Sequence, residues 1–318
     1  MHSDGRVEQK TLRHVDLFPS DWFADGGSAW TECFRILRAP LTRFPPVLQT
    51  LEIAGVRALV LYGSPRYLDT GAAKLEIKSE SEWRLNLEGV SEKAAPEDRY
   101  LILATPVRPS EGEARARIAV AVGFLTALNG RNMAWDRVYA ITLEGQDKWG
   151  GVSSAWENPL AFEVPDLTQA GQERLTRCAE ALAQSPEDVR RRLELSLRWL
   201  ASAVKDGGAD AVPKYWIALE TLAMPDGTDI RPIGEALGRS YGIAGRDANE
   251  RFLVGRLFGL RSRIVHGGIL APIHPRILEF MAAIFLDVLL DTLGQPAEGR
   301  SRAVRDRSDV DLSRLLSG

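Results

Sequence analysis

Arg261 and His266 lie five residues apart in the segment LRSRIVHGG, and these two residue types can together cleave a phosphodiester. A guanidinium is a permanent planar cation that can hold two phosphate oxygens at once. A histidine can give and take a proton near neutral pH. The segment therefore combines a phosphate ligand with a general acid–base. The structural alternative is a salt-bridged arginine followed by a histidine that faces the carbonyl groups of a helix end.

The residues around Arg261 place it on the apolar side of a predicted helix. Arg261 falls inside the apolar arc of the helical wheel, whereas Arg256 and Arg263 fall outside it. A partly buried guanidinium needs a partner, and we expect Glu220, at the rim of the apolar face of the earlier segment WIALETLA, to supply it. The apolar arc consists of Leu253, Val254, Leu257, Phe258, Leu260, Ile264 and Val265.

His266 lies in the last turn of the same predicted helix, which Gly267 and Gly268 end. On a regular helix, two side chains that are five positions apart in the sequence point about 140° away from each other. Arg261 and His266 would therefore share a site in one of two ways. Either the helix loosens at the glycines, or a second chain completes the site.

The composition is that of a globular protein without metal or nucleotide motifs. The 318 residues are 45% hydrophobic and 26% charged, and no apolar run reaches the roughly 18 residues of a membrane span. We expect a cytoplasmic protein without a signal peptide, because the first ten residues contain no apolar segment. The two cysteines and four histidines show no metal-binding spacing, so we expect no metal and no cofactor. These residues are Cys33, Cys178, His2, His14, His266 and His274.

The charge distribution permits phosphate recognition without requiring it. The net charge of −3 gives no overall attraction for nucleic acid. Residues 171–294 hold 14 arginines and two lysines against 16 acidic residues, a net charge of zero. The excess of arginine over lysine suits the binding of phosphate, but it suits salt-bridged helices equally well.

The sequence changes character near residue 170, which predicts two domains. We expect an α+β domain over residues 1–165. Its strands are predicted in GVRALVLYG, RYLILATPV and DRVYAITLEG, a hairpin in KLEIKSESEWRLNLEG, and a helix in EARARIAVAVGFLTALNG.

Residues 171–294 are predicted to form an all-helical bundle, followed by a flexible tail over residues 295–318. One predicted helix begins at the N-cap Asp247 and runs to the double glycine after His266. The last and most apolar predicted helix is PRILEFMAAIFLDVLLDTLG.

The segment LRSRIVHGG resembles the R-x4-6-H motif of HEPN domains, and YWIALETLA resembles the preceding helix of their Apea-like subgroup, including its acidic position, here Glu220. The resemblance covers roughly residues 171–294. The family often carries a polar amide or an acid directly after the arginine. Ser262, which stands there in this chain, can hydrogen-bond but cannot take a charged role.

The resemblance implies a metal-independent endoribonuclease of an antiphage or toxin–antitoxin system, with His266 and Arg261 as catalytic residues and Glu220 and Ser262 in support. It also implies an RNA substrate and a homodimer through the helix that bears the motif, with an antitoxin or regulatory protein as a possible further partner. Some HEPN domains are inactive, so a non-catalytic binding or sensor module is the alternative. Residues 1–165 resemble no family, and a sensor or regulatory role is expected for them by analogy only.

Overall fold

The computed structural model describes segments of both halves of the chain. These are residues 12–13, 20–36, 48–61, 68–69, 73–79, 82–87, 90–94, 99–128, 135–144, 148–153, 169–206, 208–224, 229–268, 272–307 and 311–316.

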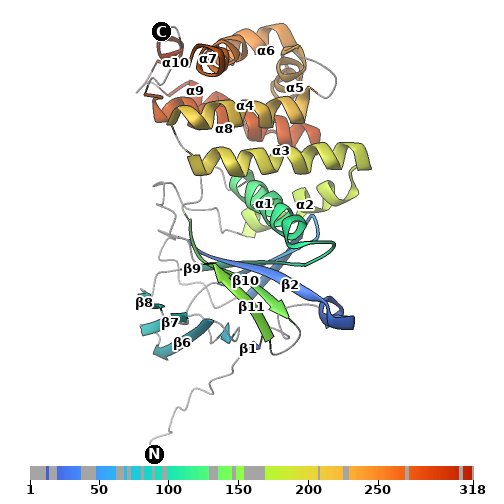
Figure 1. The fold of residues 1–318 in the computed structure, drawn as a ribbon. Coiled ribbons are helices and arrows are strands. Elements are labelled where there is room, and N and C mark those ends of the chain that lie inside the picture. Colours follow the sequence, from blue (N-terminus) through green and yellow to red (C-terminus); the bar gives the residue numbers. More distant parts are fainter. Residues whose placement is uncertain are drawn as a thin grey trace, which may run out of the picture. The chain divides into compact units, whose positions relative to one another are not determined.

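Two compact units make up the chain, and their elements are labelled in Figure 1. The first unit comprises Met1–Ile118 and Ala134–Val164 and holds all the strands. The second comprises Ala119–Met133 and Pro165–Gly318 and is helical in its described residues. The expected order of an α+β part followed by a helical part is confirmed, and the division falls inside helix α1 (Glu111–Leu128).

A six-stranded antiparallel sheet is the largest element of the first unit. Its strand order is β11-β10-β2-β9-β4-β3. The segments predicted as strands form β4, β9 and β10, while the central strand β2 was not predicted. The strands are β2 (Ser28–Ile36), β3 (Leu48–Ile53), β4 (Val56–Leu61), β9 (Arg99–Pro106), β10 (Trp135–Glu144) and β11 (Lys148–Ser153).

A second sheet of the first unit has the order β1-β5-β6-β7-β8 and contains the predicted hairpin. Its strands β6 and β7 are antiparallel, with Leu75 opposite Leu85 and Ile77 opposite Trp83. The short 3-10 helix η2 (Ser20–Gly26) precedes β2. The strands are β1 (Leu12–Arg13), β5 (Leu68–Asp69), β6 (Ala73–Ser79), β7 (Glu82–Leu87) and β8 (Val90–Ala94).

Two arginines fix the start of α1 in the first unit. The Arg115 guanidinium lies 4.3 Å from the centre of the Trp30 ring of β2, a cation–π contact. The Arg117 Nη2 donates to the carbonyl oxygen of Pro106 at 2.8 Å. The predicted helix EARARIAVAVGFLTALNG is confirmed as α1, which begins two residues before the predicted segment.

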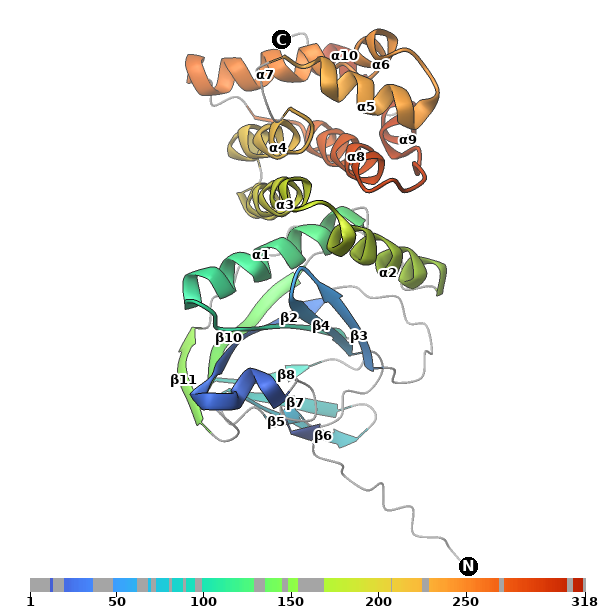
Figure 2. The same cartoon turned by 90° about the vertical axis from the view of Figure 1, so that its right-hand side faces the viewer.

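The helices of the second unit form layers, with α5 and α7 on one side of α4 and α8 and with α3 on the other side of α4 (Figure 2). Large side chains such as Trp216, Tyr215 and Phe280 are fully buried in this bundle. The helices are α2 (Gln169–Gln184), α3 (Glu187–Asp206), α4 (Gly208–Ala223), α5 (Arg231–Tyr241), α6 (Gly245–Arg251), α7 (Val254–Gly267) and α8 (Pro275–Thr292).

The crossing of α1 and α3 depends on a glycine. A Cβ atom added at Gly123 would lie 2.0 Å from the carbonyl oxygen of Leu197. Only a residue without a side chain allows the two backbones to approach so closely. Gly123 therefore sets the packing of the second half of α1 on α3.

The helix predicted from Asp247 to His266 forms as two helices, because the chain breaks between α6 and α7, and α6 begins at Gly245 instead of after a cap at Asp247. Leu253 takes a left-handed conformation with φ 55°, which is unfavourable for a residue with a Cβ atom. The neighbouring Phe252 is fully buried, and its ring lies 4.7 Å from that of Tyr241. Burial of this aromatic ring offsets the strain, and α7 starts at Val254.

The tail expected to be flexible is instead packed on the bundle over its described residues. It forms the short helices α9 (Arg300–Arg305) and α10 (Leu312–Leu315), and it buries Val304, Leu312 and Leu316. Few apolar residues suffice here, because hydrogen bonds to α8 supply the rest of the attachment.

The buried carboxylate of Asp287 in α8 holds this tail. Its Oδ2 accepts from the Tyr241 hydroxyl at 2.5 Å, from the Ser301 backbone nitrogen at 2.9 Å and from the Ser301 hydroxyl. Burial and the hydrogen bond to Asp287 raise the pKa of Tyr241, so that the phenol stays a neutral donor. Asp287 thus joins α5, α8 and α9.

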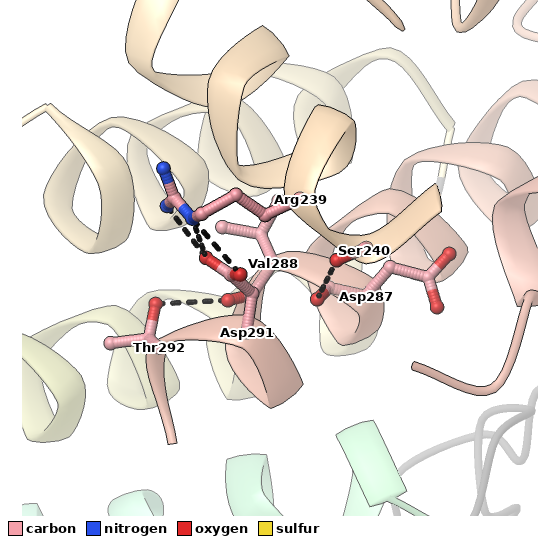
Figure 3. Close-up of polar contacts among 6 residues, drawn as sticks. All are labelled: Arg239, Ser240, Asp287, Val288, Asp291 and Thr292. Carbon is pink, nitrogen blue, oxygen red and sulfur yellow. Dashed lines mark hydrogen bonds and ion pairs between the residues drawn. The ribbon is translucent and has the colours of Figure 1, made fainter. Parts of the chain in front are cut away.

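A second polar contact fixes α5 on α8 near the same place. Figure 3 shows the Arg239 guanidinium against the carboxylate of Asp291, with Nη2 to Oδ2 at 2.7 Å and Nε to Oδ1 at 3.1 Å. In the same figure the Ser240 hydroxyl donates to the carbonyl oxygen of Asp287 at 3.4 Å. The bundle that carries α7 is therefore joined by polar as well as apolar contacts.

Candidate functional site

The first half of α7 is anchored in the bundle by apolar and aromatic contacts. Val254, Leu257 and Leu260 are buried. The Phe258 ring lies 5.5 Å from that of Trp216 in α4. Helix α7 therefore has a fixed place against α4, and its Arg261 and His266 extend from a rigid base.

The last turns of α7 extend beyond the rest of the bundle. Figure 2 shows this end of the helix reaching past α4. None of the residues 261–268 is buried, and Val265 is 47% exposed although it lies near the apolar side of the helical wheel. Both sides of the helix are thus accessible at the turns that carry the motif.

Arg261 is half-buried, as its position on the helical wheel predicts. Its Nε atom is shielded from solvent and has no hydrogen-bond partner. A shielded donor without a partner is unfavourable, since it loses its hydration and gains nothing in return. Arg261 takes part in no hydrogen bond or ion pair among the residues described, so no carboxylate there occupies its guanidinium.

The expected ion pair of Arg261 with Glu220 is absent from the described part of the chain. The Glu220 carboxylate instead accepts a hydrogen bond of 2.7 Å from the indole nitrogen of Trp216, four residues earlier on α4. The Trp216 side chain is fully buried, so its N–H requires an acceptor, and a residue one turn away satisfies it locally. Glu220 acts on α7 only indirectly, through Trp216 and its contact with Phe258.

His266 is exposed in the last turn of α7, before Gly268, which caps the helix with φ 60°. The helix is continuous as far as Gly267, so loosening at the glycines does not bring Arg261 and His266 together. Their side chains leave the axis about 140° apart. Ser262 is half-buried beside Arg261. One chain therefore does not place the two expected catalytic residues on one face.

Arg263 shares a face with His266, although it falls outside the apolar arc and was not predicted as a site residue. Three residues of a helix turn two side chains about 60° apart, so Arg263 and His266 are neighbours on the surface. Arg263 is half-buried and takes part in no hydrogen bond or ion pair among the residues described. The spacing of three in R-I-V-H is the signal that could have identified it.

Other candidates for chemistry in the described segments are few. Cys178 is fully buried, and burial raises the pKa of its thiol to about 11, which keeps it protonated at neutral pH. No group of three or more His, Cys, Asp or Glu residues there is placed to hold a metal ion. His274 accepts from the backbone nitrogen of Arg276 and caps α8. Cys33, His2 and His14 lie where the structure describes no side chain.

Comparison with known proteins identifies no relative of this chain. The chain matches no protein-family model, no curated protein and no solved structure. Within the described residues, no helix has the length and apolar character to cross a membrane.

Proposed function

We propose that the chain is a metal-independent endoribonuclease of the HEPN type that works as a homodimer. The observation that carries the proposal is Arg261, whose shielded Nε has no partner. It lies on the part of α7 that extends beyond the bundle, and the helix ends in an exposed histidine. A phosphate would satisfy the guanidinium, and the histidine would move the proton.

In the proposed reaction the ribose 2′-oxygen attacks the adjacent phosphorus and the bond to the 5′-oxygen breaks. His266 takes the proton of the 2′-hydroxyl or gives a proton to the leaving 5′-oxygen, a role that contributes about 10²–10⁴ in rate. Arg261 holds the non-bridging oxygens, on which negative charge grows in the transition state. The products are a 2′,3′-cyclic phosphate and a 5′-hydroxyl, and the reaction consumes no other reactant.

Two residues support this site without taking part in proton transfer. Ser262 follows Arg261 and offers a neutral hydroxyl to the substrate. Glu220 holds Trp216, which contacts Phe258 of α7, and so acts as a positioning residue. Neither replaces the charge of Arg261.

A second chain completes the proposed site. On one regular helix Arg261 and His266 point about 140° apart, so the Arg261 of one protomer would approach the His266 of its partner. The exposed Val265 beside Arg261 suits such an interface between copies of the chain, because its burial would be favourable. A role in antiphage defence or in a toxin–antitoxin system belongs to this proposal.

The alternative is a non-catalytic module that binds an RNA or a regulatory protein. The divergence of Arg261 and His266 within one chain favours it, because a binding surface needs no convergence of the two side chains. The absence of a Glu220 ion pair to occupy Arg261 among the described residues favours the enzyme.

The experiment is incubation of the purified protein with total RNA in EDTA, beside His266→Ala and Arg261→Lys. We expect the wild-type protein to produce cyclic-phosphate ends and both variants to produce none. The histidine supplies the proton transfer, and lysine cannot replace the planar fork of arginine. His266 is exposed at a helix end, so the variant should keep the wild-type melting temperature. RNA cleavage by a well-folded His266→Ala protein would end this assignment and leave the binding module.

A further inference from the structure

The side of α7 that faces away from the bundle carries a row of basic residues. Arg256, Gly259, Arg263 and His266 follow one another at spacings of three, four and three. On a helical wheel they fall within about 80° of one another, on the side away from the buried Val254 and Leu257. We call these four residues the basic row.

The basic row is accessible and has one sign of charge. Arg256 and His266 are exposed, and Gly259 and Arg263 are partly exposed. The whole of α7 contains three arginines and no acidic residue. The Arg256 Nη1 donates to the backbone carbonyl of Ser313 at 2.9 Å, so Arg256 is held at the start of the row, whereas Arg263 takes part in no hydrogen bond or ion pair among the residues described. The row therefore presents a positive surface to solvent.

Gly259 makes this surface flat at its centre. A Cβ atom added there would meet no atom within 4 Å, so no packing inside the chain requires a glycine. A glycine in a helix interior costs about 1 kcal/mol relative to alanine. An open position of this kind allows an extended polyanion to approach the helix backbone closely between Arg256 and Arg263.

We infer that the basic row binds the phosphodiester backbone of single-stranded RNA, with Arg263 holding the phosphate next to the one on which His266 acts. Arg263 and His266 lie about 4.5 Å apart along the helix axis and about 60° apart around it. They can therefore contact successive parts of one strand. Contacts to phosphate carry no base information, so this binding is independent of sequence. The identity of the polyanion as the substrate rests on the proposed function.

The test measures binding without cleavage. A fluorescent single-stranded 2′-O-methyl RNA of about 12 nucleotides lacks the attacking hydroxyl, and its fluorescence anisotropy reports binding by the wild-type protein. Arg263→Gln should weaken binding about three- to five-fold, the size of one exposed ion pair. It should also reduce, by about 0.7, the steepness of the fall of the logarithm of the association constant with the logarithm of the salt concentration. Gly259→Glu should weaken binding further, because it adds a negative charge to the open centre of the row.

Arg246→Gln is the matched control, since Arg246 is 88% exposed and pairs with Glu250 on the short helix α6. It should leave binding unchanged. Wild-type affinity and salt dependence in both Arg263→Gln and Gly259→Glu would overturn the inference, as would failure of the wild-type protein to bind the oligonucleotide. If the wild-type protein cleaves no RNA but Arg263→Gln weakens binding, the inference about the basic row stands and only the proposed function is refuted. If the wild-type protein cleaves RNA but neither variant changes binding, the proposed function stands and the inference is overturned.

Discussion

Arg261 shows how far a single residue can be predicted from the sequence. Its place on the apolar side of α7 follows from helical periodicity, and in the structure its Nε atom is shielded from solvent. Its partner could not be predicted in the same way. The indole nitrogen of Trp216, on the same helix as Glu220, donates a hydrogen bond of 2.7 Å to the Glu220 carboxylate, which therefore has a local partner. Contacts between helices depend on their relative offset, which periodicity does not determine.

The hydrogen bond of Glu220 leads to a prediction on stability. Glu220→Ala should lower the free energy of unfolding by about 1–3 kcal/mol, because it leaves the buried indole N–H of Trp216 without an acceptor. Glu220→Gln should stay near the wild type, since the amide oxygen can accept the same bond. Denaturant unfolding of the two variants is the measurement.

Arg261→Met is the control for this pair of variants. It removes a charge that has no ion pair among the residues described, so it should not destabilise the protein as loss of a buried ion-pair partner would. Equal destabilisation by Glu220→Gln and Glu220→Ala, together with a large loss in Arg261→Met, would show a charge pair between α4 and α7.

At the scale of the elements, the spacing of apolar residues and the glycine, proline and capping residues at the segment ends predicted most helices and several strands. The alternation of Leu75, Ile77, Trp83 and Leu85 predicted the hairpin β6–β7, which the structure confirms. The break before α7 was not predictable, because Leu253 takes a left-handed conformation without a glycine or proline to mark it. A buried aromatic ring sets that break, and such a tertiary effect is not contained in local propensity.

Two helical glycines provide opposite predictions for the same substitution. Gly259→Ala should raise the free energy of unfolding by up to about 1 kcal/mol, because the new methyl group meets open space in a helix interior. Gly123→Ala should lower it by about 1–3 kcal/mol, since its Cβ would lie 2.0 Å from the Leu197 carbonyl oxygen. Thermal or denaturant unfolding compares the two. Destabilisation by Gly259→Ala would mean that this face of α7 is already covered within the chain.

At the scale of the whole molecule, the change in sequence character near residue 170 predicted the order of the two parts. The packing of the described tail residues was not predicted, because the few apolar residues of the tail suggested no attachment. Ser301 is bound by Asp287 through its backbone and its hydroxyl, and these bonds replace the apolar stripe that a packed helix normally shows. Polar attachment of this kind depends on a distant residue and leaves no local pattern.

The central claim is that Arg261 of one chain and His266 of another form one ribonuclease site, and mixing of two inactive variants tests it most directly. Light scattering should first show a dimer at micromolar concentration for the wild type and for both variants. Arg261→Ala and His266→Ala, each inactive alone, are then unfolded and refolded together in equal amounts. Cleavage of total RNA in EDTA is measured for the mixture.

Half of all dimers in the mixture should contain one copy of each variant, and each of these has one intact site that combines Arg261 of one chain with His266 of its partner. The mixture should therefore recover about a quarter of the wild-type cleavage. A mixture that contains mixed dimers but is as inactive as each variant alone would contradict the shared site.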